Sequence, residues 1–182
     1  MIKTHSTTIL AVNHNNRLVF GGDGQVTVNN TVMKHSAVKI RRSQNGKVLA
    51  GFAGSAADSF SLFERFEAKL GEYGGNLPRA AVELAKDWRS DRFLRKLEAM
   101  MIVGNGASLF LLSGVGDVIQ PDDGVIGIGS GGTYALAAAR ALIRYGQERI
   151  DARQVVEQSL KIAAELCPFT NDSFVFEELS CD

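Results

Sequence analysis

The chain has 182 residues, of which 45% are hydrophobic and 22% are charged. These values are ordinary for one globular domain, which at this length buries roughly 70% of the surface of its unfolded chain. Twenty basic residues balance twenty acidic ones, which argues against general binding to nucleic acid or anionic lipid. Two cysteines are too few for a disulfide framework, and the three histidines fit no zinc-binding spacing.

No apolar stretch reaches the ~20 residues that cross a bilayer, and the N-terminus has no apolar segment of signal-peptide length. Neither a membrane-spanning segment nor a secretory signal is therefore predicted. We expect a cytoplasmic protein.

Residues 7 to about 54 have a pattern typical of β-strands. Short segments rich in β-branched residues are separated by turn signals, and Asn45-Gly46 predicts a hairpin turn. The expected strands are Thr8–Asn13, Arg17–Phe20, Val26–Val28, Val38–Arg41 and Val48–Phe52.

Helical periodicity follows. Ser55 and Asp58 form a capping-box pattern, and an apolar stripe follows it at helical spacing. The stripe consists of Phe60, Phe63, Phe66 and Leu70. Asn76 and Pro78 predict the start of a second helix, which we expect to continue to Leu97.

The second half of the chain repeats this order, with strands before helices. Two helices are expected, at Gly131–Tyr145 and at Asp151–Leu166 with Asp151 as N-cap. The expected strands are Met100–Val103, Ser108–Leu112, Asp117–Ile119, Val125–Ile128 and Phe174–Leu179. This segregation predicts an α+β fold in one domain, with antiparallel sheet and helices packed outside it.

The glycine loop Gly127–Gly132 matches the spacing of a dinucleotide-binding fingerprint. That fingerprint requires a following strand with an acidic residue about 20 positions further on. Here a helix follows a helix, and Asp151 is the expected helix cap. Dinucleotide binding is thus a minor alternative, which an NAD titration tests. The sequence also contains no nucleotide P-loop, so any ATP dependence would come from a partner.

Motifs along nearly the whole chain after residue 6 agree in order and spacing with one known family. They are Thr7-Thr8-Ile9, Gly22–Thr27, Val32–Lys34, Lys39–Arg42, Gly51–Gly54, Ala80–Ala99, Ile126–Tyr134 and Thr170-Asn171. Together they resemble HslV, also called ClpQ, the peptidase half of the HslUV protease, which is similar in fold to proteasome β-subunits. The resemblance implies a four-layer αββα sandwich of the N-terminal-nucleophile hydrolase type, formed by residues 7–182.

The resemblance identifies Thr7 as the nucleophile of a threonine protease. In this family the base is the α-amino group of that threonine, whose pKa of about 8 leaves part of it unprotonated at neutral pH. Thr7 is internal in this sequence, so residues 1–6 are expected to be a leader that is removed on maturation. Self-cleavage is our hypothesis for that removal, and Ser6 and Thr8 are the competing hydroxyls.

Four further residues match the family's active site. Lys39 matches a lysine beside the nucleophile, Asp23 its acidic partner, Ser130 a serine near the terminal amine, and Gly51 the N–H donor to the oxyanion. Without the resemblance, each has an ordinary interpretation: a surface lysine, a turn aspartate, a helix N-cap and a strand bulge.

The resemblance also implies a structural sodium ion held by the backbone carbonyls of Ala164, Cys167 and Thr170. A helix end leaves carbonyls without partners, so an ordinary helix terminus explains these residues equally well. For partners, the resemblance implies two stacked homohexameric rings, capped by hexamers of the HslU ATPase that unfold protein substrates and activate the peptidase.

Two alternatives to this function stay open from sequence. One is an N-terminal-nucleophile amidase that cleaves a small-molecule amide without an ATPase, and the other is a non-catalytic ring subunit. The presence of Thr7, Asp23, Lys39 and Ser130 together argues against the second. Cleavage specificity and natural substrates cannot be predicted from the sequence.

Overall fold

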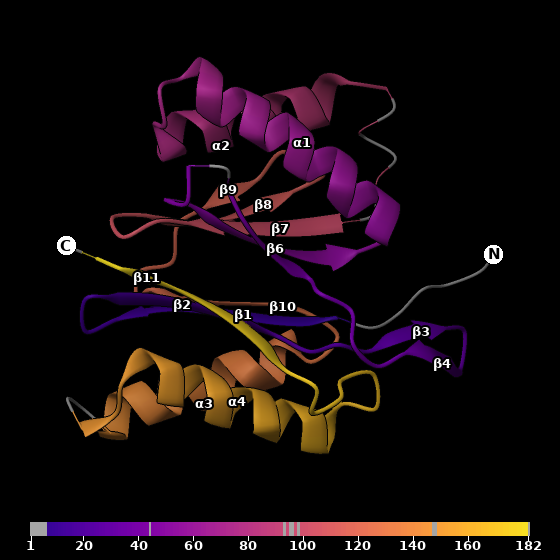
Figure 1. Cartoon of the computed structure of the whole chain (residues 1–182), viewed down its shortest axis with the longest axis vertical. Coiled ribbons are helices and arrows are strands. Elements are labelled where there is room, and N and C mark those ends of the chain that lie inside the picture. Colours follow the sequence, from indigo (N-terminus) through magenta and orange to yellow (C-terminus); the bar gives the residue numbers. More distant parts are fainter. Residues whose placement is uncertain are drawn as a thin grey trace.

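Two antiparallel sheets lie face to face, with a pair of helices on each outer side, in the computed structural model (Figure 1). The structure describes residues 7–43, 45–92, 94, 97, 99–146 and 149–181. The four-layer αββα arrangement predicted from the sequence is therefore confirmed. The predicted leader, residues 1–6, lies outside the described residues, so its removal stays a prediction.

The first sheet contains the N-terminal strand. Its strands are β1 (Thr8–His14), β2 (Arg17–Gly22), β10 (Val125–Gly129) and β11 (Val175–Ser180), in the order β10-β1-β2-β11. Every pairing is antiparallel. The central position of β1 brings its first residues beside the end of β10.

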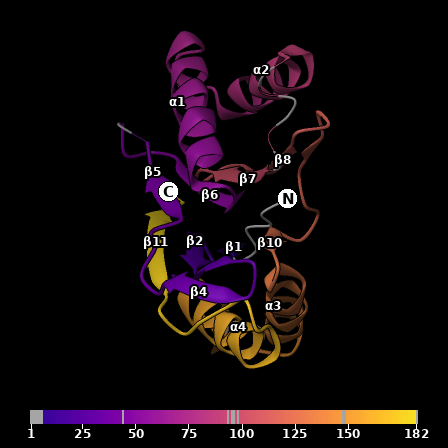
Figure 2. The same cartoon turned by 90° about the vertical axis from the view of Figure 1, so that its right-hand side faces the viewer.

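The second sheet is formed by the middle of the chain. Its strands, in spatial order, are β5 (Ile40–Arg42), β6 (Leu49–Gly54), β7 (Ala99–Gly104), β8 (Leu109–Ser113) and β9 (Val118–Ile119). The β5–β6 connection contains the predicted Asn45-Gly46 turn, where Gly46 has a φ of 71°. A separate two-stranded sheet of β3 (Val26–Val28) and β4 (Thr31–Lys34) lies beyond the ends of the main sheets (Figures 1 and 2).

The helices are α1 (Ala56–Glu72), α2 (Leu77–Ser90), α3 (Gly132–Gly146) and α4 (Ala152–Leu166). Three of them begin at a side-chain cap that accepts a hydrogen bond from a first-turn N–H group. The cap residues are Ser55, Asn76 and Asp151, and Asp151 completes a capping box with Gln154. Within the described ranges, no helix is long and apolar enough to span a membrane.

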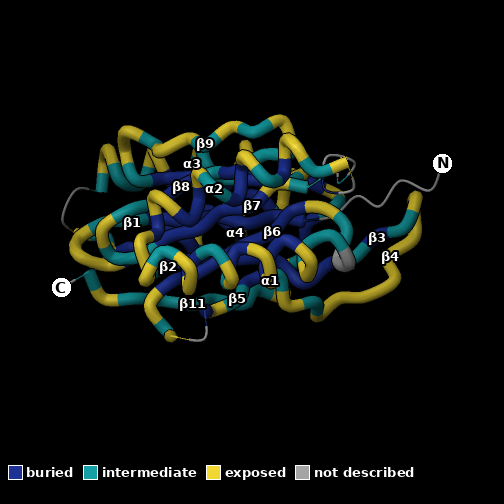
Figure 3. Tube along the Cα trace, turned by 90° about the horizontal axis from the view of Figure 1, so that it is seen from above, coloured by how far each residue is buried: buried dark blue, intermediate teal, exposed yellow. Residues whose placement is uncertain are grey.

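Strand β1 is buried on both faces because it lies between two apolar layers. Ile9 and Ala11 face the layer between the sheets, whereas Leu10 and Val12 pack with residues of α3 and α4. A third layer joins the second sheet to α1 and α2 around Trp88. Figure 3 shows the buried residues along the middle of the molecule, which explains why β1 is a continuous apolar run.

The structure differs from the sequence predictions in three details. Helix α2 ends at Ser90 and not near Leu97, because Asp91 is extended and its carboxylate accepts a hydrogen bond from Leu94 N–H at 3.1 Å. Strand β4 was not predicted, since all its residues are exposed and no core face imposes an alternating pattern. Phe60, at the start of the predicted apolar stripe, is 51% exposed, and the Arg41 guanidinium lies 3.8 Å from its ring centroid.

Candidate active site

Thr7 lies directly before β1 and is held against the end of β10. Its carbonyl oxygen accepts a hydrogen bond from Ser130 N–H at 2.8 Å, and only 6% of the residue is exposed. Gly129 has a φ of 85°, and a Cβ atom there would collide with the same carbonyl. The glycine before Ser130 is thus required for close approach to Thr7 and is not explained by dinucleotide binding.

A buried ion pair joins the two sheets beside Thr7. Asp23 follows β2 of the first sheet, and Lys39 precedes β5 of the second. Lys39 Nζ lies 2.7 Å from Asp23 Oδ1 and also donates to the Gln25 carbonyl at 2.7 Å. The side chains are 9% and 0% exposed, so solvent screens this pair little.

The Asp23 carboxylate connects this lysine to the start of β1. Its Oδ1 atom accepts from Thr8 N–H at 2.7 Å, while Oδ2 accepts from Gln25 N–H at 3.0 Å. The carboxylate is therefore held by backbone donors on two sides as well as by the lysine. This arrangement fixes the distance between the lysine and the residue next to Thr7.

Burial lowers the pKa of Lys39 from its ordinary value of 10.5, and the charge and hydrogen bond of Asp23 partly oppose that shift. Desolvation is the larger cause, because an ammonium group loses hydration when it is buried. Lys39 consequently releases its proton at a lower pH than an exposed lysine does.

The Thr8 hydroxyl is committed to structural contacts. It lies 2.7 Å from the Thr170 hydroxyl and accepts from Gly131 N–H at 3.0 Å, and Thr8 is fully buried. A Cβ atom on Gly131 would collide with both hydroxyl oxygens. Of the two adjacent threonines, Thr7 is therefore the better candidate for the nucleophile. Ser6, the other competitor, lies outside the described residues.

The structure places Ser130 and Gly51 near this site. Ser130 is exposed in the turn between β10 and α3, and because α3 begins at Gly132, Ser130 is not its N-cap. Gly51 lies in β6 opposite Ile40, the residue after Lys39. A side chain on Gly51 would collide with Ile9, so sheet packing alone explains the glycine. Its N–H role in catalysis stays a prediction.

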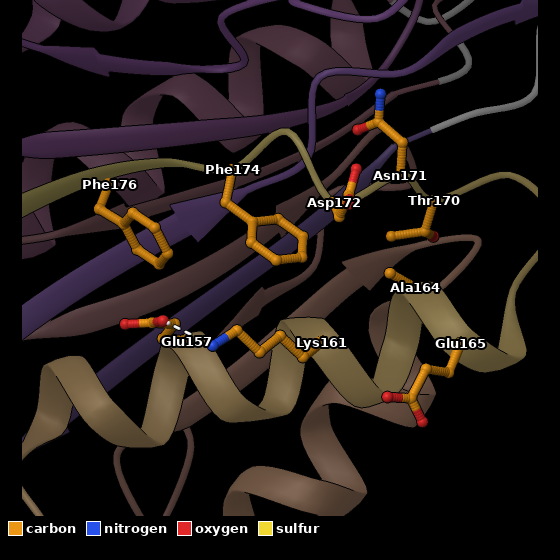
Figure 4. Close-up of a pocket in the computed structure, with 9 residues that line it drawn as sticks. All are labelled: Glu157, Lys161, Ala164, Glu165, Thr170, Asn171, Asp172, Phe174 and Phe176. Carbon is orange, nitrogen blue, oxygen red and sulfur yellow. Dashed lines mark hydrogen bonds and ion pairs between the residues drawn. The ribbon is translucent and has the colours of Figure 1, made fainter.

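The three residues predicted to hold sodium lie at the C-terminal end of α4. Ala164 and Thr170 line an open pocket of about 780 Å³, drawn in Figure 4. The Cys167 carbonyl accepts from Thr170 N–H at 3.1 Å. The Ala164 carbonyl has no helical N–H donor four residues further on, because Pro168 has no N–H. Among the described residues there is no cluster of three acidic, His or Cys side chains that suits a metal.

Three contributions to this site could not be seen in the sequence: the Gln25 carbonyl that accepts from Lys39, the contacts that hold the Thr8 hydroxyl, and the Asn171 side chain. All three lie in motifs that carry the family resemblance. Gln25 also donates from Nε2 to Thr27 Oγ1 at 3.0 Å and to the Pro168 carbonyl at 3.1 Å. Their roles are long-range contacts, which sequence spacing does not reveal.

Stacked sheets between helix pairs, with a threonine at the head of an inner strand, are the architecture of a proteasome-type N-terminal-nucleophile hydrolase. The proteasome-subunit family matches residues 3–179 of the chain. The ATP-dependent protease subunit ClpQ of Bacillus licheniformis is 60% identical over 180 residues, covering 98% of this chain and 99% of that protein. The chain belongs to this family of threonine peptidases, in its HslV (ClpQ) group.

Other relatives agree with this assignment. The ATP-dependent protease subunit HslV of a Geobacillus species is 58% identical over 98% of this chain and 100% of its own length. The crystal structure of eukaryotic HslV from Trypanosoma brucei has a TM-score of 0.90 at 47% identity, covering 95% of this chain and 99% of that one. BPH of Thiobacillus denitrificans, 19% identical with a TM-score of 0.71, shares the fold over 96% of this chain and 98% of its own.

Proposed function

We propose that this chain is the peptidase subunit of a two-component ATP-dependent protease and that Thr7, once it is the N-terminal residue, is the nucleophile. The observation that carries the assignment to Thr7 is the commitment of the neighbouring Thr8 hydroxyl to Thr170 and Gly131. Thr7 itself directly precedes the residue whose N–H is bound by Asp23. The candidate base and the charged pair are thereby brought to one place.

The reaction is acyl transfer in two steps. The Thr7 hydroxyl oxygen attacks the peptide carbonyl while its own α-amino group takes the proton and then passes it to the leaving amine. Water next hydrolyses the ester and restores the threonine. While Thr7 is internal, its nitrogen is an amide with no comparable basicity, so residues 1–6 must be removed first.

Lys39 supports this chemistry through its charge. A cation beside the nucleophile stabilises alkoxide character on the hydroxyl and disfavours protonation of the nearby amine. Asp23 orients the lysine by accepting from Nζ and from Thr8 N–H at the same oxygen atom. Gly51 N–H is the proposed donor to the oxyanion, and Ser130 completes the surroundings of the amine.

A partner supplies the ATP-driven step, in a cytoplasmic complex. Relatives at about 60% identity are named subunits of ATP-dependent proteases, and no nucleotide P-loop is found in this sequence. We propose two stacked homohexameric rings capped by hexamers of an HslU-type ATPase, which feeds in unfolded proteins and activates the peptidase. Enclosure of this kind keeps a broadly acting nucleophile away from folded cellular proteins.

Peptide hydrolysis by the purified mature protein tests this function, with and without the cognate ATPase and ATP. We expect the ATPase and ATP to increase hydrolysis at least about tenfold, the effect of roughly 1.4 kcal/mol of coupling. Intact mass of the active protein should show a chain that begins at Thr7. Activity in a chain that still begins at Met1 contradicts the mechanism, and cleavage only of small amides without an ATPase favours an amidase.

We propose that the Ala164, Cys167 and Thr170 carbonyls hold a structural sodium ion. Carbonyl oxygens at a helix C-terminus carry partial negative charge, and the Ala164 oxygen has no residue-168 N–H to accept from. We expect thermal unfolding to occur several degrees higher in sodium chloride than in choline chloride at equal ionic strength, since a ligand of the folded state stabilises it. Equal unfolding temperatures in the two salts would remove this proposal.

A further inference from the structure

The loop after α4 supplies Asn171, whose side chain lies between two segments that lead to the active site. Its Oδ1 atom accepts from Gly24 N–H at 3.0 Å, and its Nδ2 atom donates to the His35 carbonyl at 2.9 Å. Figure 4 shows the Asn171 amide pointing away from α4. The two ends of this amide therefore bind two different parts of the chain.

Gly24 and His35 lie near the start and the end of one segment that leaves the main sheets and returns to them. Between them lies the β3–β4 hairpin, which forms a sheet separate from the two main sheets. Ala37 N–H donates to the Gly24 carbonyl at 2.9 Å, and a Cβ atom on Gly24 would collide with the His35 carbonyl. We call the close approach of Gly24 to His35 and Ala37 the neck.

The charged pair flanks the neck. Asp23 immediately precedes Gly24 on one side of it, and Lys39 follows Ala37 by two residues on the other. Asn171 also donates from its backbone N–H to Asp23 Oδ2, at 3.5 Å. A two-stranded hairpin is marginally stable by itself, so β3 and β4 cannot hold the neck closed alone.

We infer that Asn171 is a positioning residue for peptide hydrolysis, which closes the neck and so holds Asp23 and Lys39 in register with Thr7. This inference rests on the proposed function of the same site. Both polar atoms of the amide are required, because Gly24 presents a donor and His35 presents an acceptor. An aspartate side chain has no donor for the His35 carbonyl, and an alanine side chain can form a hydrogen bond with neither segment.

Asn171→Ala and Asn171→Asp test the inference in the assembled, mature protein. We expect kcat to fall roughly ten- to a hundredfold in both variants, because small displacements of reacting groups have effects of that size. KM should change less than about twofold, since substrate contacts are retained. Amide hydrogen exchange, followed by mass spectrometry on peptides that cover residues 22–39, should become faster in both variants.

Asn105→Ala is the matched control. The Asn105 side chain accepts from Ala107 N–H at 3.0 Å and Ser108 N–H at 2.8 Å in the β7–β8 turn. The control therefore loses side-chain hydrogen bonds to backbone groups, as the Asn171 variants do with Gly24, His35 and Ser173. It should leave kcat and exchange across residues 22–39 unchanged. Full kcat in either Asn171 variant, a loss of kcat without faster exchange, or an equal loss in Asn105→Ala would each overturn the inference.

Failure of the proposed function gives a different result. If the wild-type protein hydrolyses no peptide with its ATPase and ATP, that function is wrong, whatever the Asn171 variants do. Hydrogen exchange then decides the structural part of the inference on its own. Faster exchange across residues 22–39 supports closure of the neck by Asn171, and unchanged exchange refutes it.

Discussion

Replacing Thr7 with alanine is expected to lower peptide hydrolysis by at least about 10³-fold, because no other described hydroxyl takes its place. The Thr8 hydroxyl is buried and bound to Thr170 and Gly131, so it cannot reach a substrate without breaking both contacts. Initial rates with a fluorogenic peptide measure the loss. If leader removal is self-catalysed, intact mass should also show that Thr7→Ala keeps residues 1–6.

Thr8→Val is the control for that experiment. Valine has nearly the same shape as threonine but leaves the Thr170 hydroxyl and Gly131 N–H without this partner, a change that costs about 1–3 kcal/mol of folding free energy. We expect lower stability together with measurable hydrolysis. Activity abolished in Thr8→Val but retained in Thr7→Ala would assign the nucleophile to Thr8.

The fold could be predicted from sequence wherever local chemistry decides the structure. The caps at Ser55, Asn76 and Asp151 depend on side chains that reach only three residues along the chain. Strand β1 was predicted from its β-branched run, whereas β4 has no buried face and left no signal. Strand order was inaccessible to local patterns, since β1 pairs with β10 from the far half of the sequence.

The site was predictable only through the family resemblance. Asp23 and Lys39 are each ambiguous alone, and the 2.7 Å contact between them depends on how two sheets stack. Gly129 belongs to the glycine loop recognised in the sequence. Only the structure shows why a glycine is needed there: a side chain would collide with the Thr7 carbonyl, which is distant in sequence. Asn171 was noticed as part of a motif, and its two backbone partners became visible only in the folded chain.

Lys39→Met is expected to lower kcat by about 10²- to 10³-fold, because the substitution removes the cation from beside the nucleophile and keeps the bulk of the side chain. Stability should fall by about 3 kcal/mol, since Asp23 is left buried without its charged partner. The backbone donors to Asp23 from Thr8 and Gln25 remain and limit this destabilisation. Hydrolysis rates and thermal unfolding measure the two effects.

The pH profile separates the electrostatic role of Lys39 from a structural one. In the wild type, activity should rise with pH as the Thr7 amine loses its proton. At higher pH it should fall as Lys39 loses its charge, and because burial lowers the pKa of Lys39 this fall should begin at a lower pH than the ordinary lysine value of 10.5 predicts. Removing the cation makes the Thr7 amine easier to protonate, so the rising limb of Lys39→Met should move to higher pH. Lys86→Met changes an exposed lysine on α2 and should leave both limbs in place. An unmoved rising limb in Lys39→Met would show that the lysine acts through packing and not through its charge.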